Sequence, residues 1–187
     1  VRGAQLPPAR WRASGDGNLQ GLNIGELHGE LLEGSVSGGG QVHWQPQLRW
    51  DMTLAASRLD PGQHWKEWPG ELSGQLSSEG SYSDNRAQLS AQLGQLGGQL
   101  RGYAVGGQID AALQGEQIQL ALQWQLDPQH GDAIASNGKL QLDGTLNAYR
   151  FSARTALHGG QLPAGEWRAA GDGNLQRITI GELHGDV

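Results

Sequence analysis

Polar and apolar residues alternate along much of this chain. In the segment 117–126 every second residue is apolar, and glutamine takes four of the positions between. A period of two is that of a β-strand with one dry face and one wet face, whereas a helix would show a period of 3.6. The segment is therefore predicted to be a strand. Its apolar members are Ile118, Leu120, Leu122, Trp124 and Leu126.

The same alternation recurs before and after this segment, separated by short links. Links this short suit antiparallel neighbours, because parallel strands need long crossovers. We therefore expect ten to twelve antiparallel strands in series. The further apolar sets are Val36, Gly38, Gly40, Val42 and Trp44; Leu48, Trp50, Met52 and Leu54; Leu89, Ala91 and Leu93; Leu140, Leu142 and Leu146; and Tyr149, Phe151, Ala153 and Leu157.

Turn and helix signals punctuate the strands. Glycine, asparagine and aspartate at 15–18, 171–174 and 143–144 are residues that favour hairpin turns, so turns are expected there. One helix is expected at 61–68, because Asp60 offers an N-cap, Pro61 suits the first helical position and Pro69 stops the helix. Trp65 and Trp68 would share one side of that helix and pack onto the dry face of the strands.

The chain contains a long internal repeat. The 28 residues from Gly3 and the 28 residues from Gly159 are identical at 19 positions, with an offset of 156. We therefore divide the chain into one repeat unit, residues 1–156, and the start of a second unit, residues 157–187. The chain begins with Val1 rather than Met, so we expect it to be a piece cut from a longer repetitive array.

Composition and charge exclude several classes of function. The chain has 187 residues, a formal charge of −6 and no cysteine, so it lacks the basic stripe of a nucleic-acid binder and cannot form a thiolate metal site. None of the six histidines lies at zinc-ligand spacing from another, and no phosphate-binding loop or nucleophile motif is present. We therefore expect no enzyme activity, no metal and no cofactor.

A dry face on ten strands must be covered, and three arrangements would do so. The sheet could close on itself as a sandwich with a filled core, form a membrane barrel, or curl into a trough that holds an apolar ligand. Aromatic residues are only 6% of the chain, too few for a large packed core or for barrel girdles. Small residues also recur on the dry side, so the trough is favoured. These are Gly38, Gly40, Gly74, Ala91 and Ala111.

Three stretches resemble a known family. They are the glycine–leucine cadence of 25–31, the Leu59-Asp60-Pro61 sequence, and the segment 68–74 that begins Trp-Pro-Gly. Together they resemble the TamB family, within the AsmA-like group of bridge-like lipid-transfer proteins. The resemblance covers most of the chain and implies an all-β, curled antiparallel sheet, a β-taco or groove-shaped β-solenoid.

The resemblance also implies a location and partners. It implies a central periplasmic part of an inner-membrane-anchored protein of a Gram-negative bacterium. The implied function is to carry phospholipids between the inner and outer membranes and to support outer-membrane protein assembly with the barrel protein TamA, which would dock on another part of the protein.

Both lines of argument give the same mechanism, a continuous dry surface that shelters a lipid tail. From the alternation we predict which residues line the groove, although the same residue types would fill a closed core. An alternative function is a chaperone-like β-surface that templates nascent barrel strands by β-augmentation. A weaker alternative is the passenger of an adhesin or autotransporter. The predicted lining is Val42, Trp44, Leu48, Trp50, Met52, Leu54, Leu120, Leu122, Trp124, Leu140, Leu142, Tyr149 and Phe151.

Overall fold

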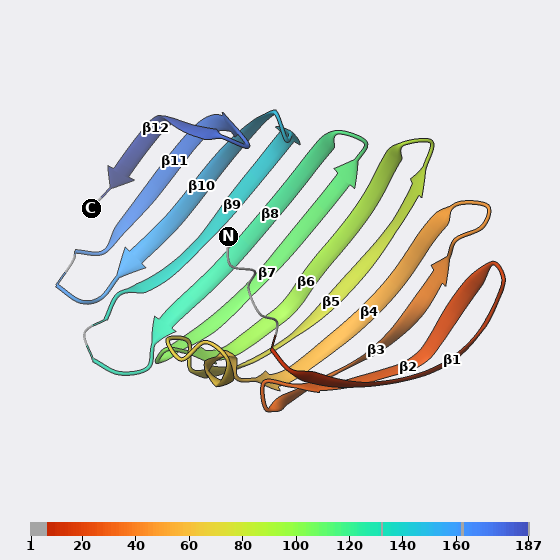
Figure 1. Ribbon diagram of the computed structural model, residues 1–187. Coiled ribbons are helices and arrows are strands. Elements are labelled where there is room, and N and C mark those ends of the chain that lie inside the picture. Colours follow the sequence, from red (N-terminus) through yellow and green to blue (C-terminus); the bar gives the residue numbers. More distant parts are fainter. Residues whose placement is uncertain (1–6, 132, 162, 187) are drawn as a thin grey trace.

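Twelve antiparallel strands form one sheet in the computed structural model, which describes residues 7–131, 133–161 and 163–186 (Figure 1). Each strand pairs with the strands before and after it in the sequence, so the sheet is a simple meander. The strands are β1 (Ala9–Asn18), β2 (Gly21–Leu31), β3 (Gly34–His43), β4 (Leu48–Leu59), β5 (Gly70–Ser83), β6 (Arg86–Leu100), β7 (Tyr103–Gln114), β8 (Gln117–Pro128), β9 (Ala135–Thr145), β10 (Ala148–His158), β11 (Gly165–Asn174) and β12 (Arg177–Asp186). The all-β prediction and the antiparallel order are confirmed.

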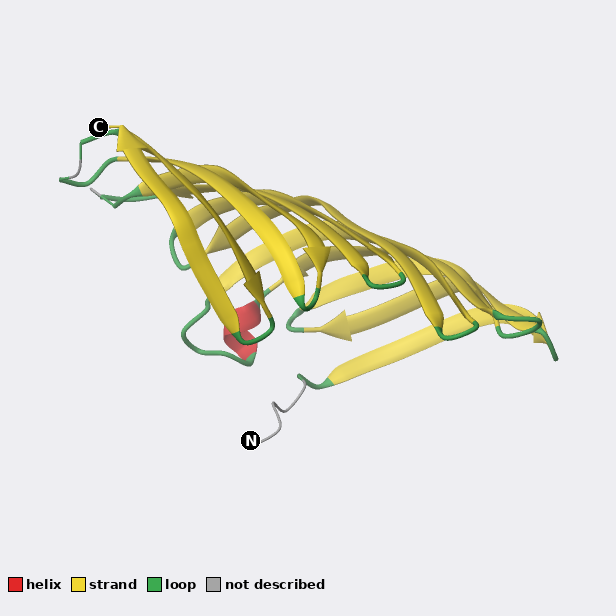
Figure 2. Ribbon diagram, turned by 90° about the horizontal axis from the view of Figure 1, so that it is seen from above, coloured by secondary structure: helices red, strands yellow, loops and turns green. Residues whose placement is uncertain are grey.

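The sheet is open, twisted and curled (Figure 2). Its edges are β1 and β12, which lie at opposite ends of the strand order. Irregularities in register occur in six of the strand pairs, including β1–β2 between Ser14 and Gly15 and β11–β12 between Ala170 and Gly171. Bulges of this kind bend a strand and increase its twist, which explains the curl.

The hairpin turns lie beyond the glycine-rich segments that were predicted to form them. Gly15 and Gly17 belong to β1, Gly144 belongs to β9, and the first turn consists of Leu19 and Gln20 instead. Asn18 closes this turn, because its side-chain oxygen accepts hydrogen bonds from the amides of Gln20 (2.7 Å) and Gly21 (3.2 Å). Asn174 closes the equivalent turn in the same way.

The predicted two-turn helix at 61–68 was wrong in length. The structure forms a single 3-10 turn, η1 (Pro61–Gln63). Asp60 caps it as expected, but its Oδ1 also accepts a hydrogen bond from the Gly70 amide at 3.0 Å, at the start of β5. This bond closes residues 60–70 into a compact loop. Together with the Gln63 side chain, it holds the pKa of Asp60 below its ordinary value.

The two tryptophans of this loop do not pack onto the sheet as expected. Trp65 and Trp68 remain 44% and 47% exposed. The Trp68 ring instead carries the guanidinium of Arg101, 5.0 Å from the ring centroid, in a cation–π contact.

The molecule has almost no core. Its accessible surface is 13225 Å², whereas a compact monomer of 19.9 kDa would expose roughly 8,700 Å². Within the described part of the chain, Val36 and Ala135 are the only hydrophobic residues that are buried. A single sheet layer explains this, because the described residues form no second layer on either face of the sheet.

The sequence repeat is also a repeat of structure. Trp11 lies opposite Gly29 in the β1–β2 hairpin, and Trp167 lies opposite Gly185 in the β11–β12 hairpin. The register irregularities fall at equivalent positions in the two hairpins. The equivalent hairpins are therefore offset by ten strands, with the eight strands β3 to β10 between them.

Candidate functional site

One row of residues crosses all twelve strands and contains only apolar side chains and one glycine. Residues paired directly across a sheet lie on the same face, so these side chains form a continuous ridge. At about 4.8 Å per strand it is roughly 50 Å long. We call it the central row: Ala13, Leu27, Gly38, Leu54, Leu76, Leu93, Ile109, Leu122, Leu140, Ala153, Ala169 and Leu183.

Three more rows flank the central row on the same face. On β8 they pass through Ile118, Leu120 and Trp124, and across the sheet none of them contains an Asp, Glu, Lys or Arg. We call these four rows the apolar face. They cover on the order of 1,000 Å², about 50 Å across the strands and 20 Å along them. Soluble monomers rarely expose a contiguous apolar patch beyond a few hundred Å².

Eleven of the thirteen predicted lining residues lie in these four rows. Leu122, Leu140 and Leu54 lie in the central row, and the others in the flanking rows. Leu48, at the start of β4, pairs with Tyr82 and lies outside the four rows, beyond the row that passes through Ile118. Trp44 follows the end of β3, where its indole donates a hydrogen bond to the Leu19 carbonyl (2.8 Å). The remaining eight are Val42, Trp50, Met52, Leu120, Trp124, Leu142, Tyr149 and Phe151.

Other members of the apolar face were not among the predicted lining residues, although Leu93 belongs to one of the alternating apolar sets. Leu76, Leu93 and Ile109 occupy the middle of the central row. Their strands are interrupted by serine, glycine and alanine, so their alternation is weaker than that of β8. The register of each strand against β8 identifies them.

Large aromatic rings on the apolar face lie over glycines of the next strand. A Cβ placed at Gly185 would lie 2.6 Å from Cε3 of Trp167, and a Cβ at Gly138 would lie 2.7 Å from Cη2 of Trp124. Trp11 covers Gly29 in the same manner. Glycine therefore lets each indole lie flat on the sheet, and the face stays smooth although it carries bulky rings.

The indole N–H groups of two such tryptophans are satisfied within the sheet. Trp50 Nε1 donates to Ser78 Oγ and Trp124 Nε1 donates to Ser136 Oγ, each at 3.1 Å. An unsatisfied donor facing an apolar ligand would cost about 1–3 kcal/mol. Because of these bonds, the indole N–H groups of Trp50 and Trp124 are not unsatisfied donors on the apolar face.

The opposite face is polar. Along β8 it carries Gln119, Gln123 and Gln125, and the paired residues on neighbouring strands include Asp143 and Lys139. In the described ranges no three His, Asp or Glu side chains gather as a metal site would require. The described part of the chain also holds no helix with the length and apolar content to cross a bilayer.

These features define an elongated, single-layer β-sheet with one apolar face, as found in groove-shaped β-proteins. A comparison of the sequence with models of known protein families identifies the family to which the chain belongs. The model of the TamB N-terminal domain matches residues 1–120 and again residues 109–187, and so covers the whole chain. The chain belongs to the TamB family of bacterial envelope proteins, a family associated with outer-membrane assembly. No solved structure matches the chain.

Proposed function

We propose that the apolar face carries phospholipid acyl chains through the periplasm, between the inner and outer membranes of a Gram-negative bacterium. In this proposal the chain is the periplasmic part of an inner-membrane-anchored protein. It supports outer-membrane protein assembly together with the barrel protein TamA, which contacts another part of the protein. The observation that carries the proposal is the apolar face, whose central row is continuous across all twelve strands.

The dimensions of the face suit a lipid tail. One leaflet of a bilayer core is about 15 Å thick, half of the roughly 30 Å hydrocarbon thickness. An acyl chain laid along the strands would fit within the roughly 20 Å spanned by the four rows. The head group would then lie at the ends of the strands, in water, and the roughly 50 Å across the strands would be the direction of travel.

The energetics suit retention without a fixed site. Sheltering a CH₂ group from water is worth about 0.8 kcal/mol, so a sixteen-carbon tail with half its surface against the sheet gains about 6 kcal/mol. A shift by one strand exchanges apolar neighbours of the same kind, for example Leu122 for Leu140. A tail is therefore held on the face but can move along it.

Photo-crosslinking tests this proposal at two adjacent positions. A photoreactive residue at Leu122 faces the apolar side, and the same residue at Gln123 faces the polar side, so Gln123 is a matched control. We expect phospholipid adducts at Leu122 and few at Gln123 in the full protein in cells. Equal labelling at both positions would contradict the proposal.

A second candidate function uses the sheet edges instead of the apolar face. The free backbone groups of β1 and β12 favour β-augmentation, in which a nascent barrel strand adds to an edge. Photo-crosslinks to barrel precursors from residues of the edge strand β12, with no lipid adducts at Leu122, would favour this function over lipid transfer.

A further inference from the structure

A row of basic side chains crosses the polar face over the last four strands. Lys139 on β9 lies opposite Arg154 on β10, Arg154 lies opposite Arg168 on β11, and Arg168 lies opposite His184 on β12. We call these four residues the basic row. Like charges directly opposite each other destabilise a sheet, so this arrangement requires another explanation.

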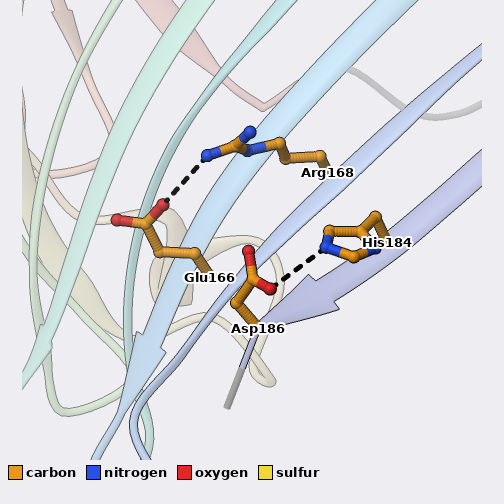
Figure 3. A network of polar contacts seen from close by, with 4 residues as sticks. All are labelled: Glu166, Arg168, His184 and Asp186. Atoms are coloured by element: carbon orange, nitrogen blue, oxygen red, sulfur yellow. Dashed lines mark hydrogen bonds and ion pairs between the residues drawn. The ribbon is translucent and has the colours of Figure 1, made fainter.

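Two acidic side chains contact the Arg168 and His184 end of the basic row (Figure 3). Arg168 Nη2 lies 3.7 Å from Glu166 Oε2, and His184 Nε2 lies 3.0 Å from Asp186 Oδ1. Among the residues that the structure describes, no carboxylate forms an ion pair with Lys139 or Arg154. The chain nevertheless has 19 acidic residues against 13 lysines and arginines, so acidic partners are not scarce.

Arg150 shows what the usual arrangement looks like on the same strand. It lies four residues before Arg154 and on the same face, and its directly opposed neighbours are Asp143 and Asp172. On β10, therefore, Arg150 lies between two acidic residues, whereas Arg154 lies between two basic residues.

The basic row also lines a hollow of about 570 Å³. All four residues of the row line the hollow, together with the neutral polar side chains of Gln141 and Ser152. Glu182 lines it on the β12 side. Neutral donors beside clustered cations are suited to hydrogen-bonding the oxygens of an anion.

We propose that Lys139, Arg154 and Arg168 bind a phosphate group, carried by a phosphorylated solute or by a phospholipid head group. A guanidinium presents a planar pair of N–H donors that fits two phosphate oxygens, and the lysine ammonium adds a point charge. Bound phosphate would neutralise the repulsion within the row. The site lies on the face opposite the proposed lipid path, so its existence does not depend on lipid transfer.

The repeat gives the site a place in the array. Arg12 and His28, paired on β1 and β2, are the repeat equivalents of Arg168 and His184. The basic row therefore spans the junction between one repeat unit and the next. A phosphate site would recur there once per ten strands, at about 48 Å intervals.

Titration of the full protein with pyrophosphate tests the site by isothermal calorimetry at low ionic strength. Loss of a hydrogen bond to a charged group is worth about 1.5–3 kcal/mol, so Arg154→Gln should weaken binding by at least about tenfold. Arg150→Gln removes the same charge from the same strand and should leave the affinity nearly unchanged. Equal weakening by both variants, or no saturable binding by the unaltered protein, would overturn the proposal.

Vesicles identify the source of the phosphate. Vesicles of a phosphate-free galactolipid report contact through apolar surface alone, so binding to them is expected to be equal in both variants. Weaker binding of Arg154→Gln to phosphatidylglycerol vesicles would assign the site to a lipid head group. Unchanged vesicle binding together with lost pyrophosphate binding would assign it to a soluble phosphorylated ligand.

Discussion

Replacing Gly138 by alanine tests whether the flat tryptophans depend on the glycines beneath them. A Cβ at this position would lie 2.5 Å from the Arg154 carbonyl oxygen and 2.7 Å from Trp124 Cη2. The contact with the Arg154 oxygen can be relieved only by a shift of the strand. The contact with Trp124 requires the indole to swing away and give up its hydrogen bond to Ser136. The change therefore removes packing and a polar contact together.

The expected loss of stability follows from these two contributions. Lifting a ring that shelters about 100 Å² costs roughly 2.5 kcal/mol at 25 cal/mol per Å². The hydrogen bond adds about 1 kcal/mol. Alanine in place of glycine within a strand returns about 0.5–1 kcal/mol. These terms sum to about 3 kcal/mol, and the strand shift at Arg154 adds to them, so we expect the free energy of unfolding to fall by at least that amount.

Urea unfolding followed by far-ultraviolet circular dichroism measures this effect in the full chain. Gly106→Ala is a matched control, because a Cβ there would have its nearest neighbours at 3.8 and 3.9 Å, in β6 and β8. The control should be neutral or slightly stabilising. If the two variants unfold at the same urea concentration, the stacking of Trp124 on Gly138 does not stabilise the sheet.

Two other predictions concern the central row and the loop at 60–70. Leu122→Arg should block lipid passage in a membrane-to-membrane transfer assay while the circular dichroism spectrum stays unchanged. Gln123→Arg should leave both lipid passage and the spectrum unchanged. Equal transfer by the two variants would contradict the role of the apolar face. Asp60 has a pKa lowered by the Gly70 amide, so its stabilisation of the loop is present above its ordinary pKa and lost as the pH falls through the lowered value. The protection of the Gly70 amide against hydrogen exchange, measured relative to its intrinsic rate at each pH, should therefore fall in strong acid, and at neutral pH in Asp60→Ala. Unchanged protection in that variant would refute the cap.

The strands were predictable because their period is local. Leu120, Leu122 and Trp124 alternate with glutamine, and any strand with that pattern presents one apolar side. The antiparallel order also followed from short links. Eleven of the thirteen residues chosen for the groove lie on the apolar face for this reason.

The turns were not predictable from the same signals, because glycine serves two purposes in this sheet. Gly15 resembles a turn residue, yet it lies in β1, where a side chain would overlap the backbone of Asn23. Gly144 lies in β9 with a φ of 139° and similarly close to Ala148. Close approach between strands depends on register, which sequence alone does not provide.

The loop and the basic row depended on contacts that are distant in sequence. A two-turn helix was expected after Asp60, but the bond from Gly70 to its carboxylate favours a tight loop instead. Lys139, Arg154 and Arg168 are 15 and 14 residues apart and share no motif. Only strand pairing brings them together.

Lipid analysis of the purified protein tests the central claim most directly. The protein is isolated from cells without detergent, extracted with organic solvent and examined by mass spectrometry, with Leu122→Arg treated in parallel. If the apolar face holds acyl chains, phospholipid will be present in stoichiometric amounts and will fall sharply in the variant. An extract with no phospholipid above that of an unrelated soluble protein would contradict the account.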